Sequence, residues 1–183
     1  ATLPYAILAF IALVALSPLL LVIAVLVRIR LGAPVLFRQT RVGLDKRAPG
    51  PDADNHRRTK DIGGKPFDIY KFRTMCVNAE HLSGAVWAAK EDPRVTPVGR
   101  FLRQYRLDEL PQLINILKGE MSLVGPRPER PHFVDQFCEA YPRYVARHRV
   151  PSGLTGWAQI HGLRGDTSIA DRARFDNYYI ENW

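Results

Sequence analysis

The stretch Leu3–Val27, LPYAILAFIALVALSPLLLVIAVLV, decides the fold class of this chain. It runs for 25 residues without a charged side chain, which is long enough to cross a bilayer core at helical rise. No small-residue cleavage site of the A-x-A type follows it, so it does not read as a secretory signal peptide. Arg28 and Arg30 come directly after it and indicate that this end lies on the cytoplasmic side. We therefore expect a protein associated with a lipid bilayer.

Ser17 and Pro18 interrupt this apolar stretch near its middle. Proline removes one helical hydrogen bond, and a serine hydroxyl can satisfy the carbonyl that is left free. One interpretation is a kinked helix that spans the membrane. The other is a broken helix that enters and leaves on the cytoplasmic face, because each half is too short to cross alone. The residues by themselves leave both interpretations open.

Composition limits the partners of the chain. Its 183 residues suffice for one modest domain, and 26 lysines and arginines against 18 acidic residues give a formal charge of +8. This excess predicts contact with an anionic partner such as nucleic acid, anionic lipid or a phosphorylated small molecule. Nucleic acid is disfavoured because the arginines are dispersed along the chain. Cys76 and Cys138 form no metal or disulfide motif.

Short elements are expected after the apolar stretch. Their order is a β-rich run at 32–44, a mobile polar loop at 45–65, a strand at 67–75, and helices at 97–107 and 111–118. The strands are too few for a doubly wound sheet. We predict an α+β fold: a compact, mostly helical, membrane-associated domain with a few short strands.

Two adjacent carboxylates stand out in this basic chain. Asp108 and Glu109 lie in the run LDELPQL, just before Pro111, which we expect to be the first residue of a helix. The simplest role for Asp108 is therefore a helix N-cap. The alternative is a chemical role, with one carboxylate as a nucleophile and its neighbour as a metal ligand.

Several cations favour the chemical role. Arg100, Arg103 and Arg106 lie within eight residues upstream of Asp108, and Arg127 lies between two prolines that stiffen its backbone. A rigidly presented guanidinium suits phosphate binding. Carboxylates, Mg²⁺ and pre-positioned cations together are the requirements of phosphoryl transfer, and the cations would keep the aspartate ionised.

Five motifs occur in a characteristic order: FRQTRVG, IYKFRTM, DPRVTPVGRFLR, LDELPQLINILKGEMSLVGPRP and GLTGWAQIHG. Together they resemble the bacterial sugar transferase family, the monotopic polyprenol-phosphate phosphoglycosyl transferases. The resemblance covers nearly the whole chain, from about Leu16 onwards. It implies an enzyme at the cytoplasmic face of the bacterial inner membrane that transfers a sugar 1-phosphate from a UDP-sugar to undecaprenyl phosphate and releases UMP.

The resemblance also implies roles for individual residues. Asp108 would be the nucleophile of a ping-pong reaction, and Glu109 and Mg²⁺ would assist, with both carboxylates as metal ligands. The phosphate-binding candidates are Lys71, Arg73, Arg103, Arg127 and Arg164, the last displaced from the usual position. Residues 1–31 would form a re-entrant helix broken at Ser17-Pro18, and residues 32–183 the catalytic domain.

Some expectations stay open at this point. The family often has Pro-Gly before the LTG motif, whereas this chain has Pro151-Ser152-Gly153. Its similarity to large exopolysaccharide-type members implies glucose or galactose 1-phosphate, with an N-acetylated sugar as the alternative, and further membrane helices and another domain ahead of the catalytic part. A homodimer is one option. The rival mechanisms are direct transfer in a ternary complex and a membrane-anchored adaptor without turnover.

Overall fold

The computed structural model describes residues 3–45, 63–77, 79 and 92–182. The contacts within it divide the chain into two compact units, each of which is described by itself. The first unit comprises residues 1–39, 69–121 and 164–166, and the second comprises residues 40–68, 122–163 and 167–183. Most of the loop predicted at 45–65 lies outside the described residues.

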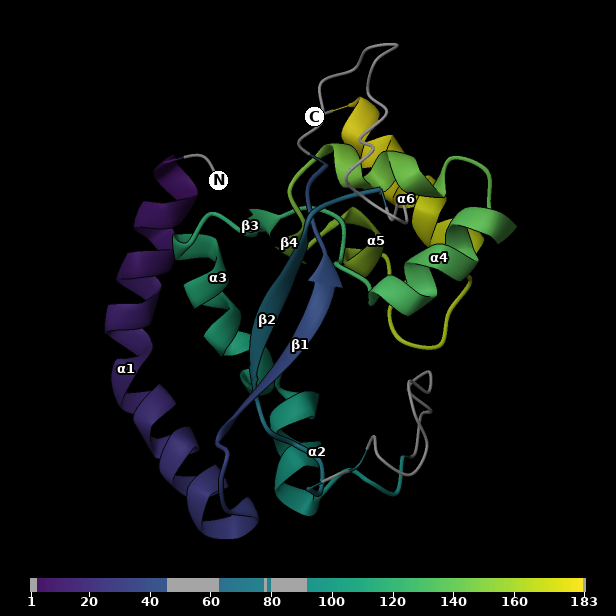
Figure 1. The fold of residues 1–183 in the computed structure, drawn as a ribbon. Coiled ribbons are helices and arrows are strands. Elements are labelled where there is room, and N and C mark those ends of the chain that lie inside the picture. The colour runs from purple at the N-terminus through teal and green to yellow at the C-terminus, as the bar shows by residue number, and fades with distance from the viewer. Residues whose placement is uncertain (1–2, 46–62, 78, 80–91, 183) are drawn as a thin grey trace. The chain divides into compact units, whose positions relative to one another are not determined.

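Helix α1 (Leu3–Leu31) is the element that the apolar stretch predicts, and among the described residues it is the one helix long and apolar enough to cross a membrane. Its helical residues continue through Ser17 and Pro18, and its axis bends along its length (Figure 1). The proline leaves the Val14 carbonyl without its helical donor, and the Ser17 Oγ donates to that carbonyl at 2.7 Å. The predicted break thus takes the form of a bend in a continuous helix, while its re-entrant path stays a prediction.

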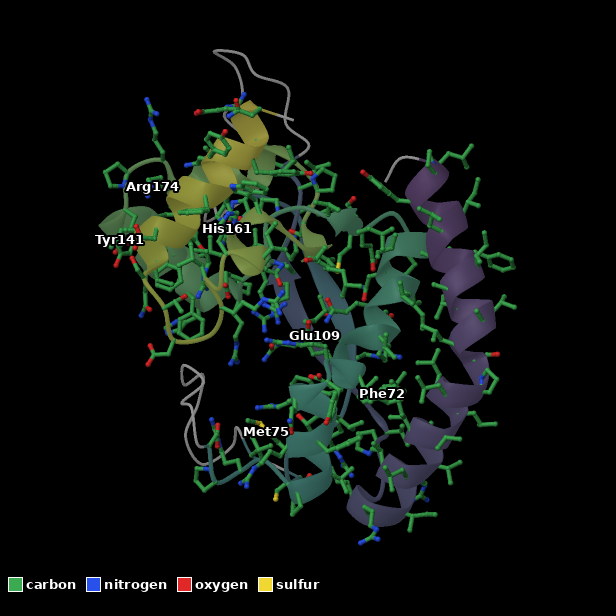
Figure 2. All side chains as sticks on the ribbon, turned by 180° about the vertical axis from the view of Figure 1, so that it is seen from behind. Phe72, Met75, Glu109, Tyr141, His161 and Arg174 are labelled. Carbon is green, nitrogen blue, oxygen red and sulfur yellow. The ribbon has the colours of Figure 1, made fainter. Side chains whose placement is uncertain are left out.

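The core of the first unit lies on one side of α1. Ile23 and Val27 pack there with Phe72 of strand β2 and Leu102 of helix α2 (Pro97–Gln104). Phe72 points toward α1 (Figure 2). Most other apolar side chains of α1 are exposed, which is the pattern expected of a helix that faces lipid.

Strands β1 (Leu36–Val42) and β2 (Pro66–Phe72) form a two-stranded sheet, and each contributes residues to both units. They confirm the two β segments predicted from the sequence. β2 ends earlier than expected because the chain leaves the sheet after Phe72, and only an isolated antiparallel bridge joins Met75 to Val95. The strand end places Lys71 beside the acidic run described below.

The second unit is built around a parallel pair of short strands. β3 (Ser122–Val124) pairs with β4 (Gly153–Thr155), with Ser122 opposite Gly153 and Val124 opposite Thr155. The helical elements are α4 (Pro131–Ala140), the 3₁₀ helix η2 (Tyr144–Arg149), α5 (Trp157–Ile160) and α6 (Ile169–Glu181). The buried core consists of Val42, Val134, Tyr144 and Ala173. The mostly helical α+β fold is thereby confirmed.

The helix predicted to begin at Pro111 begins later. The run containing the acidic pair forms a 3₁₀ helix, η1 (Leu107–Gln112), and α3 (Leu113–Leu117) follows it. Arg106 precedes η1 in the left-handed conformation, with φ of 59°, and this turns the chain into a tighter 3₁₀ path. Asp108 is consequently not the helix N-cap. The predicted stop is confirmed, because Gly119 takes a positive φ of 71° just after α3.

Candidate active site

The first turn of η1 carries both carboxylates into the interior of the first unit. Asp108 and Glu109 are only 6% and 7% exposed, although both are acidic. Lys71, at the end of β2, lies beside them, and its Nζ is 2.7 Å from Glu109 Oε1 (Figure 2 labels Glu109). Since an unpaired charge is costly to bury, this ion pair explains how the glutamate is tolerated there.

Asp108 is less well satisfied than its neighbour. Its Oδ1 is buried and accepts no hydrogen bond from the described residues. Burial raises the pKa of this carboxyl group, the charge of Lys71 counteracts that rise, and the charge of Glu109 adds to it. A buried carboxylate oxygen with free lone pairs, in cationic surroundings, is available to a metal ion or an electrophile.

Helix α2 presents Arg103 toward this acidic pair. The Nε of Arg103 donates to Thr74 Oγ1 at 2.9 Å. Helix α2 can lie this close to Thr74 because residue 99 is glycine. A Cβ on Gly99 would lie 1.9 Å from the Thr74 carbonyl oxygen. Burial lowers the pKa of Arg103, and the negative charge of Asp108 opposes that effect. The packing of α2 thus fixes a cation within electrostatic range of the buried carboxylate.

Arg73 makes structural contacts that the sequence did not predict. Its guanidinium donates to the carbonyl oxygens of Leu31, Gly32 and Ala33, the latter two at 2.9 and 2.7 Å. Cations are favourable at the C-terminal end of a helix, where carbonyl groups lack partners. In this structure Arg73 therefore anchors the end of β2 to the end of α1, and its phosphate-binding role stays a prediction.

The two remaining predicted cations lie in separate segments. Arg127 belongs to the second unit, where its Nη1 donates to Gln159 Oε1 at 3.4 Å. Arg164 is partly buried and belongs to the short segment 164–166 that groups with the first unit. The structure thus brings Lys71 and Arg103 to the acidic pair and commits Arg73 to the backbone.

Sequence reasoning missed two polar residues that follow the acidic pair. Gln112 is 2% exposed, and its Nε2 has no hydrogen-bond partner among the described residues. Asn115 is fully buried, and its Oδ1 accepts from the backbone N–H of Tyr70 at 3.1 Å. It therefore ties α3 to the strand residue next to Lys71. The feature of the sequence that could have indicated these two residues is the presence of two amide side chains within the otherwise apolar run LPQLINIL.

The acidic pair satisfies the requirements of a Mg²⁺ site in part. Mg²⁺ is usually held by one or two carboxylates together with substrate phosphates. Asp108 offers a buried oxygen that accepts no hydrogen bond from the described residues, and Glu109 adjoins it, so these residues fit the ion. The described part of the chain contains no group of three or more histidine, cysteine, aspartate or glutamate side chains that could hold a metal ion. Substrate phosphates and water are the usual further ligands of Mg²⁺.

These features define a class of protein before any relative is considered: an α+β protein with a helix long and apolar enough to cross a membrane, and with a buried acidic pair and cations that suit phosphate groups. Comparison with known families agrees with this class. The sequence pattern described as "Bacterial sugar transferase" matches residues 5–183, and the chain belongs to that family.

Several curated relatives are similar over most of the chain. One is the UDP-N-acetylgalactosamine-undecaprenyl-phosphate N-acetylgalactosaminephosphotransferase of Aeromonas hydrophila, 46% identical over 91% of this chain and 36% of the relative. Another is the UDP-glucose:undecaprenyl-phosphate glucose-1-phosphate transferase of Escherichia coli K12, 42% identical over 97% of this chain and 35% of the relative. A Caulobacter vibrioides protein with the same name as the latter is 42% identical over 91% of this chain and 57% of its own length. The chain thus spans little more than a third of the first two relatives.

Proposed function

We propose that this chain transfers a sugar 1-phosphate from a UDP-sugar to undecaprenyl phosphate and releases UMP. The reaction would take place at the cytoplasmic face of the bacterial inner membrane, as the first membrane step of exopolysaccharide or glycoconjugate synthesis. The observation that carries the proposal is the buried Asp108 Oδ1, which accepts no hydrogen bond from the described residues and adjoins the Lys71–Glu109 ion pair. The names of the relatives support the substrate classes.

In the first step, a carboxylate oxygen of Asp108 attacks the β-phosphorus of the UDP-sugar. The bond between that phosphorus and the oxygen bridging to the α-phosphorus breaks, and UMP leaves with the electron pair. A phosphosugar-aspartyl enzyme remains. The carboxylate must be ionised to attack, and the nearby charges of Lys71 and Arg103 favour the ionised form against the effect of burial.

In the second step, a phosphate oxygen of undecaprenyl phosphate attacks the same phosphorus. The acyl-phosphate bond breaks, the Asp108 carboxylate is restored, and the lipid leaves as a sugar diphosphate. Lys71, Arg103, Arg127 and Arg164 bind and orient phosphate oxygens of the two substrates in this proposal. Asp108 and Glu109 would hold Mg²⁺, which neutralises developing negative charge when it is bound.

The membrane segment fits this chemistry if it is re-entrant. A helix that enters and leaves on the cytoplasmic side would hold the acidic pair near the lipid headgroups, where a lipid phosphate and a soluble nucleotide can both reach it. The bend and the Ser17–Val14 hydrogen bond in α1 support this topology. The positive charge of the chain would add attraction to anionic lipid.

The sugar is proposed as a hexose, glucose or galactose, with an N-acetylated sugar as the alternative. Relatives of both kinds are similar to the chain, since one is named for N-acetylgalactosamine and another for glucose. Their identities of 46% and 42% are too close to decide between the two.

The test is the intact mass of the protein after UDP-glucose, UDP-galactose or UDP-N-acetylgalactosamine is added singly, with Mg²⁺ and without undecaprenyl phosphate. We expect a sugar-phosphate adduct on the parent protein and none on Asp108→Asn. Glu139→Gln, which changes an exposed carboxylate on α4, serves as the matched control and should form the adduct.

Other outcomes separate the rival mechanisms. UMP release that appears only when undecaprenyl phosphate is present, without any adduct, would replace the covalent mechanism by direct transfer with Asp108 as a metal ligand. A protein that binds lipid but releases no UMP under any condition would be an adaptor. The UDP-sugar that gives the adduct identifies the sugar class.

A further inference from the structure

The segment Gly125–Arg130, GPRPER, is held along its whole length by other elements of the second unit. Its two prolines have no N–H group, so they cannot donate to a neighbouring strand. Four successive carbonyl oxygens of the segment nevertheless accept hydrogen bonds. Gly153 N donates to the Pro126 carbonyl at 2.9 Å, and Arg147 Nη2 donates to the Arg127 carbonyl at 3.0 Å. Arg41 Nη1 donates to the Pro128 carbonyl at 3.3 Å, and Val42 N donates to the Glu129 carbonyl at 2.9 Å.

Arg147 is the more deeply buried of the two arginines among these donors. It is 1% exposed, and its carboxylate partner Asp176, on α6, is 3% exposed. Its Nη2 and Nε lie 2.6 and 3.2 Å from Asp176 Oδ2. Its Nη1 donates to the Tyr144 hydroxyl at 2.6 Å. All three nitrogens are thus engaged, and Nη2 is shared between the aspartate and the Arg127 carbonyl.

Stability alone gives little reason for a charged pair in this position. A buried ion pair can often be replaced by apolar residues of similar volume without loss of stability. Apolar residues cannot donate to the Arg127 carbonyl, whereas the planar guanidinium of Arg147 binds Asp176 and still reaches that carbonyl. What this pair supplies beyond packing is therefore a fixed backbone at Arg127.

A second buried tie holds the same segment from its other end. Glu129 Oε1 lies 2.9 Å from Arg172 Nη1, and Glu129 Oε2 lies 3.4 Å from Arg41 Nη1. These contacts hold the residues that follow Arg127, and the Arg147 hydrogen bond holds the Arg127 carbonyl itself.

We propose that Arg147, held by Asp176, is a positioning residue that fixes the direction in which Arg127 presents its guanidinium to a substrate phosphate. The inference rests on the proposed function, in which Arg127 binds such a phosphate. A displacement of about 1 Å in a positioning group can reduce catalysis by about 100-fold. Loosening the Arg127 carbonyl should therefore affect turnover even when the protein remains folded.

The experiment is a double-mutant cycle of Arg127→Ala and Arg147→Lys. Lysine keeps the positive charge beside Asp176 but has no planar fork. UMP release is measured with UDP-glucose and UDP-N-acetylgalactosamine in undecaprenyl-phosphate vesicles, giving kcat and KM, and thermal unfolding gives the folded fraction. Arg149→Lys, at an exposed position of the same 3₁₀ helix, is the matched control.

We expect Arg147→Lys to lower kcat/KM by about 10–100-fold while Arg149→Lys stays at the parent value. The double variant should have a kcat/KM no lower than that of Arg127→Ala alone. Once the Arg127 guanidinium is removed, the hydrogen bond from Arg147 no longer has a guanidinium to direct. A residue that only stabilises the fold would instead multiply the two losses.

The proposal is overturned if the two losses multiply, or if folded Arg147→Lys keeps the parent kcat/KM. If Arg147→Lys does not fold, Asp176→Glu takes its place in the cycle, with the same expectation and the same refutation. Absence of UMP release by the parent would refute the proposed function itself. An active parent with an unaffected Arg127→Ala would refute the phosphate-binding role of Arg127.

Discussion

Two regions of the molecule bury carboxylates beside cations, and they satisfy them to different degrees. In the second unit, Asp176 Oδ2 accepts two hydrogen bonds from Arg147, at 2.6 and 3.2 Å. In the first unit, Asp108 Oδ1 is equally enclosed but accepts none from the described residues. Both aspartates are buried, but the Asp108 oxygen can still bind a ligand, whereas the Asp176 oxygen already accepts two hydrogen bonds.

The difference indicates which region is built for structure and which for chemistry. A carboxylate oxygen that already accepts two hydrogen bonds from one guanidinium serves to hold that guanidinium and has less capacity for a substrate. A buried carboxylate with a free oxygen costs stability, and such costs are typical of functional sites. This contrast is the one expected if, as proposed, Asp108 takes part in the reaction and Asp176 holds Arg147 in position.

The largest expected effects come from exchanging each aspartate for asparagine. Asp108→Asn should reduce UMP release by about 10³-fold or more, as loss of a nucleophile does. It should also leave the melting temperature unchanged or raise it, because a buried charge is removed. Asp176→Asn leaves Arg147 without its ion partner and should cost about 3–5 kcal/mol of unfolding free energy. Thermal unfolding and UMP release of both variants check the contrast, and equal losses of stability would contradict it.

The ion pair of the first unit can be tested by removing its cation. Lys71→Met leaves Glu109, 7% exposed, without the lysine at 2.7 Å. We expect UMP release to fall by about 10²–10³-fold and the melting temperature to drop. The double variant Lys71→Met/Glu109→Met should regain stability but not turnover. Lys65→Met, at an exposed position, is the control and should keep the turnover and the melting temperature of the parent. Parent-level turnover in Lys71→Met would contradict a role for Lys71 in the active site.

A smaller effect is expected from loosening helix α2. In Gly99→Ala the new methyl group would lie 1.9 Å from the Thr74 carbonyl oxygen, so α2 must move and Arg103 must move with it. We expect about a tenfold loss of kcat/KM and a melting temperature lower by about 2–4 °C for each kcal/mol of clash. Gln104→Ala, exposed on the same helix, is the control. Unchanged turnover in Gly99→Ala would show that Arg103 does not depend on this packing.

The smallest effect is on pH dependence. Burial raises the pKa of Asp108 above its ordinary value of 3.8, so protonation should reduce UMP release at a higher pH than for an exposed aspartate, by about tenfold per pH unit. Between the ordinary and the raised pKa the folded state binds the proton more tightly, so the free energy of unfolding should fall as pH rises through that window. Asp108→Asn should lack this slope. A parent and a variant with identical pH–stability curves would contradict the raised pKa.

Much of this arrangement could be predicted from the sequence because it is local. The apolar stretch, the strand that carries Lys71, and the Asp108–Glu109 pair all depend on neighbouring residues and were recognisable as patterns. The exact start of the helix after the pair was not, because a proline suits both the first turn of an α-helix and a 3₁₀ turn.

The rest depends on contacts between residues far apart in the chain. In the sequence, Arg73 is one more cation near Lys71 and is therefore predicted to bind phosphate. Only the structure shows that its guanidinium binds carbonyl groups at the end of α1. Arg147 and Asp176 are 29 residues apart, and nothing in the sequence around either residue indicates that their side chains meet. Charges of the same type therefore take on structural or chemical roles according to partners that a linear pattern does not contain.

The anchoring of Arg73 has a mechanical consequence. Its guanidinium holds the Leu31 carbonyl at the end of α1 and the two carbonyls that follow it, and its backbone lies two residues beyond Lys71 on the same chain segment. With α1 in the bilayer, as proposed above, a displacement of that helix along the bilayer normal would pull on the lysine that neutralises Glu109. Turnover in vesicles of graded acyl-chain length should accordingly depend on bilayer thickness, and Arg73→Lys should weaken that dependence.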